Sequence, residues 1–326
     1  MLLTKNVSSD TESVLCGVPQ GSVLGPLLFI IYTNDLPNSL TFTKAILFAD
    51  DTTIFCAGKD KKVLFNNLNH DLVKLIDWFR TNKLSLNFPK TNYIYFKPKY
   101  SQNDDDSPDP LLSFGADVIE RKQNIKILGL YIDENLQWSN HISHLVSKLS
   151  KSNFILKTAN HILNIESMLT LYYSLVYSHI NYGIALWGPS TNMSNINTLV
   201  KVQKRVVRTV KNASYNAHTH EIFKELNILK LPKIIDLELL KLIYLFIHKD
   251  LPSTLHNIFT LNSQIHVYDT RHKNDPRNFK HKTATFNKSF LNKGPTLWSE
   301  IPNEYKCKFT IKCFSKKIKK YLLDKY

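Results

Sequence analysis

Two adjacent carboxylates, Asp50 and Asp51, stand between two apolar, β-prone runs at residues 45–48 and 52–55. This pattern predicts a tight β-hairpin with both carboxylates at its tip. Two unit charges about 4 Å apart repel by roughly 4 kcal/mol at an effective dielectric of 20, and a divalent cation is the usual compensation. Mg²⁺ prefers hard oxygen ligands, commonly one or two carboxylates plus substrate phosphates. Taken alone, however, an Asp-Asp pair in a turn is more often a polar hairpin tip, so the neighbouring sequence must decide.

The segments around this hairpin predict helices that would support it. Ser22 can cap a helix in which Leu24, Leu27, Leu28 and Ile31 share one face. A second amphipathic helix is predicted to end near residue 80, because apolar residues recur at spacings of four, three and four from residue 68 to residue 79. Strands and helices therefore alternate, and this part of the chain is expected to be α/β.

An acidic run at residues 104–106 stands among prolines. We interpret it as a solvated loop rather than a metal site, because three consecutive carboxylates without structural context are a weak signal.

From residue 137 the apolar periodicity is helical almost throughout. Helices are predicted at residues 141–159, 166–177, 195–211 and 232–248, with a last short one at 309–323. We therefore expect a domain boundary near Leu136, with domains at residues 1–136, 137–215 and 216–326. The last of these is a basic, mainly helical extension.

The composition favours a polyanionic partner. Lys and Arg number 42 against 27 Asp and Glu, which gives a net charge of +15 and a pI near 9.4. Nucleic acid is the first candidate. The longest apolar stretch is far shorter than the roughly 20 residues that span a bilayer, so no membrane segment is expected.

The N-terminus lacks the features of a secretory signal, and the four cysteines at positions 16, 56, 307 and 313 suggest no disulfide framework. We expect a protein that is not secreted and stays in a reducing compartment, nuclear or cytoplasmic. The cysteines are interpreted as structural thiols, with a zinc site as a minor alternative.

The sequence before the two aspartates resembles a known family. Residues 17–29, GVPQGSVLGPLLF, followed by Tyr32 and by NDLP at 34–37, are similar to the segment upstream of the catalytic aspartates in reverse transcriptases of LINE-type (non-LTR, jockey-like) retrotransposons. In that family, Phe-Ala-Asp-Asp is the metal-binding tip of the palm. A chance match of two long motifs in the right order is improbable.

Further motifs of the same family follow in order. LSLN at residues 84–87 with Lys90 and Thr91 resembles the next palm motif, whose lysine would neutralise triphosphate charge. Residues 127–133 resemble the hairpin that grips the primer end, with Leu128 and Gly129 at its turn. Gly129 would let backbone approach backbone.

The helical region after residue 137 resembles the family's thumb. One predicted helix there has an apolar stripe at residues 199, 202, 206 and 210. Its adjoining face carries Lys201, Lys204, Arg205 and Arg208. A solvated surface is the commonest meaning of such charges, but in a thumb they favour contact with the nucleic-acid backbone.

The resemblance implies a partial polymerase palm followed by a helical thumb and extension. It implies template-directed nucleotidyl transfer with Mg²⁺ or Mn²⁺ held by Asp50 and Asp51, and nucleotide and template contacts at Gln20, Gly21 and Lys90. The partners would be an RNA template, a DNA primer or RNA–DNA hybrid, and deoxynucleoside triphosphates.

The family's fingers and its first metal-binding aspartate lie upstream of this motif, and only 16 residues precede Gly17 here. We therefore expect an N-terminally truncated and inactive polymerase. The alternatives are a non-catalytic nucleic-acid-binding remnant and, more weakly, a helical scaffold. The oligomeric state stays open.

Overall fold

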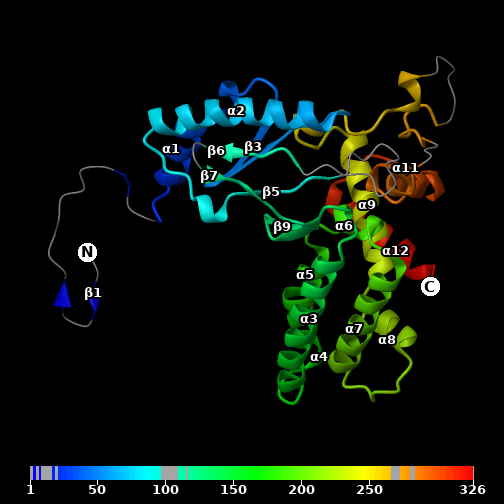
Figure 1. The fold of residues 1–326 in the computed structure, drawn as a ribbon. Helices are drawn as coiled ribbons and strands as arrows, with labels where there is room; N and C mark the ends of the chain where they lie inside the picture. The colour runs from blue at the N-terminus through cyan, green and yellow to red at the C-terminus, as the bar shows by residue number, and fades with distance from the viewer. Residues whose placement is uncertain are drawn as a thin grey trace. The chain divides into compact units, whose positions relative to one another are not determined.

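The computed structural model describes residues 3–4, 7–8, 17–18, 21–96, 109–114, 117–265, 272–279 and 283–325. The chain divides into two compact units (Figure 1). The first unit comprises residues 1–95 and 100–122, and the second comprises residues 96–99 and 123–326. Gln20 and the acidic run at 104–106 lie outside the described residues.

The first unit is α/β. Its helices are α1 (Leu24–Thr33) and α2 (Lys61–Thr81), with short 3₁₀ turns η1 (Leu36–Ser39) and η2 (Phe88–Lys90). Its strands are β1 (Leu3–Thr4), β2 (Val7–Ser8), β3 (Lys44–Phe48), β4 (Asp51–Phe55), β5 (Asn92–Tyr93), β6 (Ser113–Phe114), β7 (Asp117–Val118) and β8 (Glu120–Arg121). Each pairs with one partner: β1 with β2, β3 with β4 and β6 with β7 are antiparallel, whereas β5 and β8 are parallel.

One face of α2 provides most of the core of the first unit. Leu72 and Leu75 of the predicted stripe are buried there together with Phe65. Leu68 and Phe79, the other two residues of the stripe, are half-buried and pack against the same core. They pack with Leu36 of η1 and with residues of the β6–β8 region. The Asp60 side chain caps the start of α2 by accepting from the Val63 amide.

Helix α1 forms where the sequence predicted a helix. Ser22 Oγ accepts from the Gly25 amide at 3.1 Å, as a helix-start hydroxyl should. The face that Leu24, Leu27, Leu28 and Ile31 share is exposed, with Leu24, Leu27 and Ile31 between 54% and 64% accessible and Leu28 close behind. Because α1 is apolar nearly all round, the spacing of its leucines does not distinguish an inner side.

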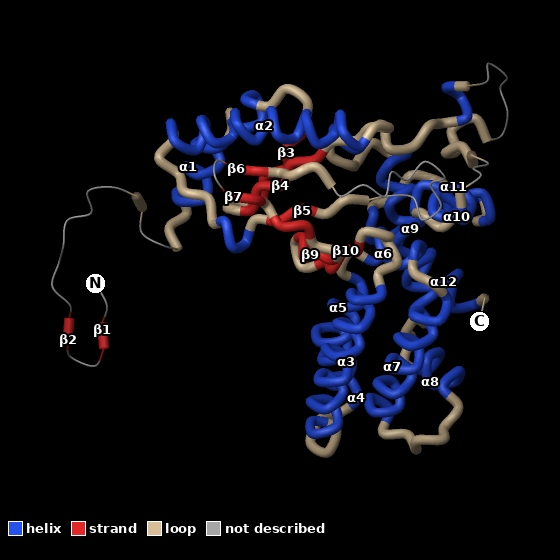
Figure 2. Tube along the Cα trace, viewed as in Figure 1, coloured by secondary structure: helices blue, strands red, loops and turns tan. Residues whose placement is uncertain are grey.

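The second unit is mainly helical (Figure 2). It opens with one hairpin, β9 (Asn124–Ile127) and β10 (Leu130–Asp133). Its helices are α3 (Ser139–Ala159), α4 (Ile165–Tyr172), the π-turn η3 (Tyr173–Tyr177), α5 (Ser178–Asn181), α6 (Ile184–Ser190), α7 (Met193–Lys211), α8 (Thr219–Glu225), α9 (Leu231–Ile247), α10 (Ala284–Asn287), α11 (Phe290–Glu300) and α12 (Ile311–Asp324). Short 3₁₀ turns lie at Ser253–Leu255, Asn262–Gln264 and Asn303–Tyr305.

Helix α9 is the centre of this unit, drawn in yellow in Figure 1. It packs against α6, α7, α11 and α12, and most of its side chains are buried. A buried amide links three neighbouring segments: Gln203 of α7 donates to the Tyr172 hydroxyl of α4 and to the Leu229 carbonyl, and it accepts from the Leu231 amide. Because every polar atom of this side chain has a partner, its burial costs little.

The long helices lie where the periodicity predicted them, each within a few residues. The units divide after Lys122, before the β9–β10 hairpin, because β10 packs on α3. The contacts show no division at residue 215, since α7 and α9 share one hydrophobic core. No helix in the described part of the chain is both long and apolar enough to cross a membrane.

Candidate active site and nucleic-acid interface

Asp50 and Asp51 lie at the tip of the β3–β4 hairpin, as predicted. Phe48 pairs with Asp51, which leaves Ala49 and Asp50 as a two-residue turn. Ala49 has φ +50°, a left-handed conformation that costs a non-glycine residue roughly 1 kcal/mol. Both carboxylates are exposed, and within the described residues neither forms an ion pair. Two carboxylates with hard oxygen donors are therefore presented to solvent, and no cation among the described residues neutralises them.

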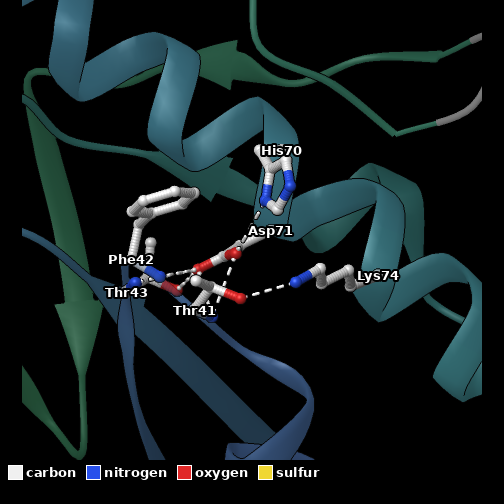
Figure 3. A network of polar contacts seen from close by, with 6 residues as sticks. All are labelled: Thr41, Phe42, Thr43, His70, Asp71 and Lys74. Carbon is white, nitrogen blue, oxygen red and sulfur yellow. Dashed lines mark hydrogen bonds and ion pairs between the residues drawn. The ribbon is translucent and has the colours of Figure 1, made fainter.

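The base of this hairpin is held by Asp71 of α2 (Figure 3). Its fully buried carboxylate accepts from three consecutive backbone amides, those of Thr41, Phe42 and Thr43, at 2.8–3.2 Å. The Thr43 hydroxyl adds a fourth bond at 2.9 Å. Since β3 begins at the next residue, these bonds attach the start of the hairpin to α2.

The donors around Asp71 favour its ionised form. Burial alone would raise the pKa of Asp71, but the backbone bonds from Phe42, Thr41 and Thr43 and the bond from the Thr43 hydroxyl outweigh burial and lower it to about 2. The cluster is completed at its edge by His70, whose Nδ1 lies 3.2 Å from the carboxylate, and by Lys74, which donates to the Thr41 hydroxyl.

The other first-unit residues predicted for the site are exposed. Gly21 has φ +88° in the turn before α1, a conformation that favours glycine. Lys90 ends the 3₁₀ turn η2, where its amide donates to the Asn87 carbonyl. No hydrogen bond or ion pair within the described residues joins Lys90 to the two aspartates.

Leu128 and Gly129 form a two-residue turn between β9 and β10 in the second unit. Both have positive φ, +46° and +85°, which is the signature of a type I′ hairpin turn. The Tyr182 hydroxyl donates to the Leu128 carbonyl, so the turn is tied to the end of α5. The predicted hairpin and its glycine are confirmed, whereas contact with a primer is untested.

Helix α7 carries the basic face. Its apolar stripe at residues 199, 202, 206 and 210 is buried, as predicted. Lys201 and Arg205 are exposed and Lys204 is half-buried; within the described residues their side chains form neither ion pairs nor hydrogen bonds. Arg208 differs, because its Nε donates to the Ala217 carbonyl and its guanidinium lies over the Tyr215 ring. Arg208 therefore helps to hold the α7–α8 connection.

The donor set at the hairpin tip fits a hard divalent cation but is small. Two adjacent carboxylates are the number that Mg²⁺ commonly takes from a protein when substrate phosphates supply the rest. Across the part of the chain that the structure describes, no group of three or more His, Cys, Asp or Glu residues is placed to hold a metal.

Comparison with known proteins agrees with this geometry. Residues 2–132 match the family model described as reverse transcriptase (RNA-dependent DNA polymerase). This segment contains the β3–β4 hairpin and its aspartates. Residues 2–132 belong to the reverse transcriptase family.

Curated relatives extend the likeness into the second unit. The chain is 25% identical to the probable RNA-directed DNA polymerase from transposon X-element of Drosophila melanogaster and 24% identical to that from mobile element jockey of the same species. It is 26% identical to the probable RNA-directed DNA polymerase from transposon BS of that species. These matches cover 68%, 68% and 70% of the chain, more than residues 1–132 contain, so they include part of the second unit.

The chain spans about a quarter of the length of these relatives, with 24%, 25% and 26% of each covered. No solved structure gave a significant match to the chain.

The sequence analysis missed two groups of residues that matter in the structure. Asp71 was only one polar residue on an amphipathic helix, and nothing local reveals that three amides 28 to 30 residues earlier converge on it. His141, His144 and Lys148 lie on one face of α3 at spacings of three and four. That spacing was visible in the sequence, but only the structure shows that they line a pocket.

Asp71→Asn should destabilise the first unit by about 2 kcal/mol at pH 7, the free energy that matches a pKa lowered from 3.8 to about 2. Because the folded-state pKa is depressed, this contribution is present above pH 4 and is lost as the pH falls from about 4 to 2. Hydrogen–deuterium exchange of residues 40–55 should report faster opening in the variant at pH 7.

Asp77→Asn is the matched control, since it removes an exposed carboxylate from the same helix. Equal exchange in the Asp71 and Asp77 variants would show that the carboxylate does not hold the hairpin.

Proposed function

We propose that this chain carries the metal-binding hairpin tip and the primer-contacting turn of an RNA-directed DNA polymerase of a non-LTR retrotransposon. The observation that carries the proposal is the pair of exposed, unneutralised carboxylates at a strained hairpin tip inside the segment that matches the family. Backbone strain of this kind persists where the surroundings over-determine it, commonly at functional sites.

In this proposal the first unit is part of the polymerase palm and the second contains the thumb. Asp50 and Asp51 hold the metal; Gln20, Gly21 and Lys90 face nucleotide and template. Divalent Mg²⁺ or Mn²⁺, when bound, would activate the primer 3′-hydroxyl and stabilise the leaving pyrophosphate. Leu128 and Gly129 position the primer end, because a rigid type I′ turn offers its backbone at a fixed place.

The substrates in this proposal are deoxynucleoside triphosphates and a primer annealed to an RNA template. Lys90 is exposed and suited to a triphosphate, because a lysine ammonium is a compact point charge that neutralises phosphate oxygens.

The 326-residue chain alone is expected to show no primer extension. Two-metal transfer needs a coordination shell that bridges both ions, and the described residues offer only the two adjacent aspartates at this tip. The measurement is extension of a labelled DNA primer on RNA with Mg²⁺ or Mn²⁺. Strong extension that Asp50→Asn abolishes would contradict this expectation.

The catalytic role of the hairpin is tested in a longer, chimaeric protein. A chimaera of the jockey polymerase whose matching segment is replaced by residues 17–95 should extend a primer. Asp50→Asn in this chimaera should lower kcat by about a hundredfold or more, because losing a metal ligand removes roughly 3 kcal/mol of transition-state stabilisation.

Asp77→Asn in the same chimaera is the control and should leave kcat unchanged, since this exposed residue lies on α2 away from the hairpin tip in sequence. A chimaera that extends primers equally well with Asp50→Asn would exclude this hairpin as the metal-binding tip.

The basic face of α7 is proposed to contact the phosphate backbone of the duplex. Lys201, Lys204 and Arg205 carry it, because their charges are not neutralised by carboxylates in the described residues. Such contacts position a protein on a duplex without reading sequence.

Replacing Lys201, Lys204 and Arg205 by Gln should weaken binding to an RNA–DNA hybrid and reduce its salt dependence. Each phosphate contact contributes about 0.7 to 0.9 to the slope of log affinity against log salt, so the slope should fall by about 2 to 3. A salt titration by fluorescence anisotropy measures this. Folding should be unaffected because the apolar stripe of α7 is untouched.

A triple variant of Lys59, Lys62 and Lys83 to Gln removes the same charge from exposed positions of the first unit. If both triple variants lower the slope equally, net charge rather than the α7 face accounts for binding.

A further inference from the structure

A pocket of about 250 Å³ lies in the second unit beside the β9–β10 turn. Gly129 borders it on the turn side, α3 contributes His141, His144 and Lys148, and the segment around α5 contributes His179 and Tyr182. Three histidines and a lysine thus line one small cavity. No carboxylate is among the lining residues, which is unusual for a cluster of cationic and titratable groups.

His141 is the buried member of this cluster. It is 2% exposed, and neither ring nitrogen has a hydrogen-bond partner. Buried polar nitrogens usually have a partner, so this pair in the pocket wall is available to hydrogen-bond with a polar group in the pocket. The other three groups, His144, Lys148 and His179, are more accessible.

The electrostatics of the pocket disfavour added positive charge. Burial and then the neighbouring charges of His144 and Lys148 lower the pKa of His141 to about 4. The pKa values of His144 and His179 are also lowered, first by burial and then by Lys148. The histidines are therefore mainly neutral near pH 7, while the cation of Lys148 is not offset by a carboxylate of the pocket wall.

We propose that this pocket binds a phosphate group, held by Lys148 with His144 and His179 as donors and with His141 in the wall behind them. A metal ion is not the ligand that the cluster fits, because no group of three His, Cys, Asp or Glu residues in the described ranges is close enough to hold one. The volume accommodates a phosphate with part of an attached sugar, or a pyrophosphate, and is below that of drug-sized ligand pockets.

Phosphate binding in this pocket is coupled to proton uptake. An anion beside a neutral histidine favours its charged form, so the ligand raises the pKa values that burial and Lys148 lower. On α3 the charged or titratable groups near His144 are His141, Lys148 and Lys151; on the hairpin they are Lys126 and the Tyr131 ring, and on α5 it is His179. All the charges in this set are positive, so affinity should increase as the pH falls.

The source of the phosphate is either the backbone of a bound nucleic acid or a free phosphate compound. The backbone source rests on the proposed function, because it needs a primer or template near the β9–β10 turn. Binding of free pyrophosphate does not depend on the proposed function. The two are therefore tested in separate arms.

The first arm follows histidine resonances by NMR during a pH titration with and without inorganic pyrophosphate. The pKa values of His144 and His179 should rise on binding, because the bound anion favours their charged forms. Lys148→Met should lower the affinity about tenfold or more. Lys157→Met removes an exposed charge from the same helix and should have no effect.

The double variant His144→Gln and His179→Gln should lose part of the pH dependence seen in the parent, and the remainder comes from the protonation of pyrophosphate itself. An unchanged pH dependence in this variant, or histidine pKa values unmoved by pyrophosphate in the parent, would overturn the proposal. Circular dichroism establishes that each variant is folded, and the parent titration tests the proposal without any variant.

The second arm adds an RNA–DNA hybrid in competition with pyrophosphate. Displacement of pyrophosphate by the hybrid, lost in Lys148→Met, supports a backbone phosphate as the natural occupant. Pyrophosphate binding without displacement supports a free phosphate compound and counts against nucleic acid at this place. Failure of both the hybrid and pyrophosphate to bind at the pocket overturns the phosphate site, even if the α7 face binds the hybrid elsewhere.

Discussion

The Asp71 carboxylate organises the part of the molecule on which the candidate chemistry depends. It gathers three consecutive amides and one hydroxyl at the point where the chain enters β3. A buried carboxylate with four donors is stable as an anion, while each unpaired amide would cost about 1 to 3 kcal/mol. The β3–β4 hairpin is therefore anchored at its base, and its tip can present Asp50 and Asp51 to solvent without bonds of their own.

Local patterns in the sequence predicted most of the elements because the information is local. The Phe-Ala-Asp-Asp hairpin, the Gly129 turn and the helices of the second unit follow from alternation, turn chemistry and periodicity. Helix α1 shows what periodicity leaves open. Periodicity shows which side chains share a face, but whether anything covers that face is a property of the tertiary structure, and Leu24, Leu27 and Ile31 are exposed.

The site was predictable only in part, because its support is non-local. The aspartates and the basic residues of α7 stand out by type and spacing, whereas Asp71 matters through a loop about 30 residues away. Arg208 shows the same limit. Its spacing groups it with Lys201, Lys204 and Arg205, yet its Nε is bonded to the Ala217 carbonyl. A helical charge pattern cannot distinguish a solvated guanidinium from one that holds a loop.

Each unit holds a group of side chains whose charge or polarity the described residues do not offset. In the first unit two adjacent carboxylates face solvent with no ion-pair partner in the described residues. Like charges within a few ångströms repel by about 1 to 4 kcal/mol, so a bound cation would stabilise this pair. In the second unit Lys148 and three mainly neutral histidines line a pocket without a carboxylate, so the lysine charge and the imidazole N–H donors would stabilise an anion. The two sites therefore favour ligands of opposite charge, and each preference follows from the side chains of its own unit.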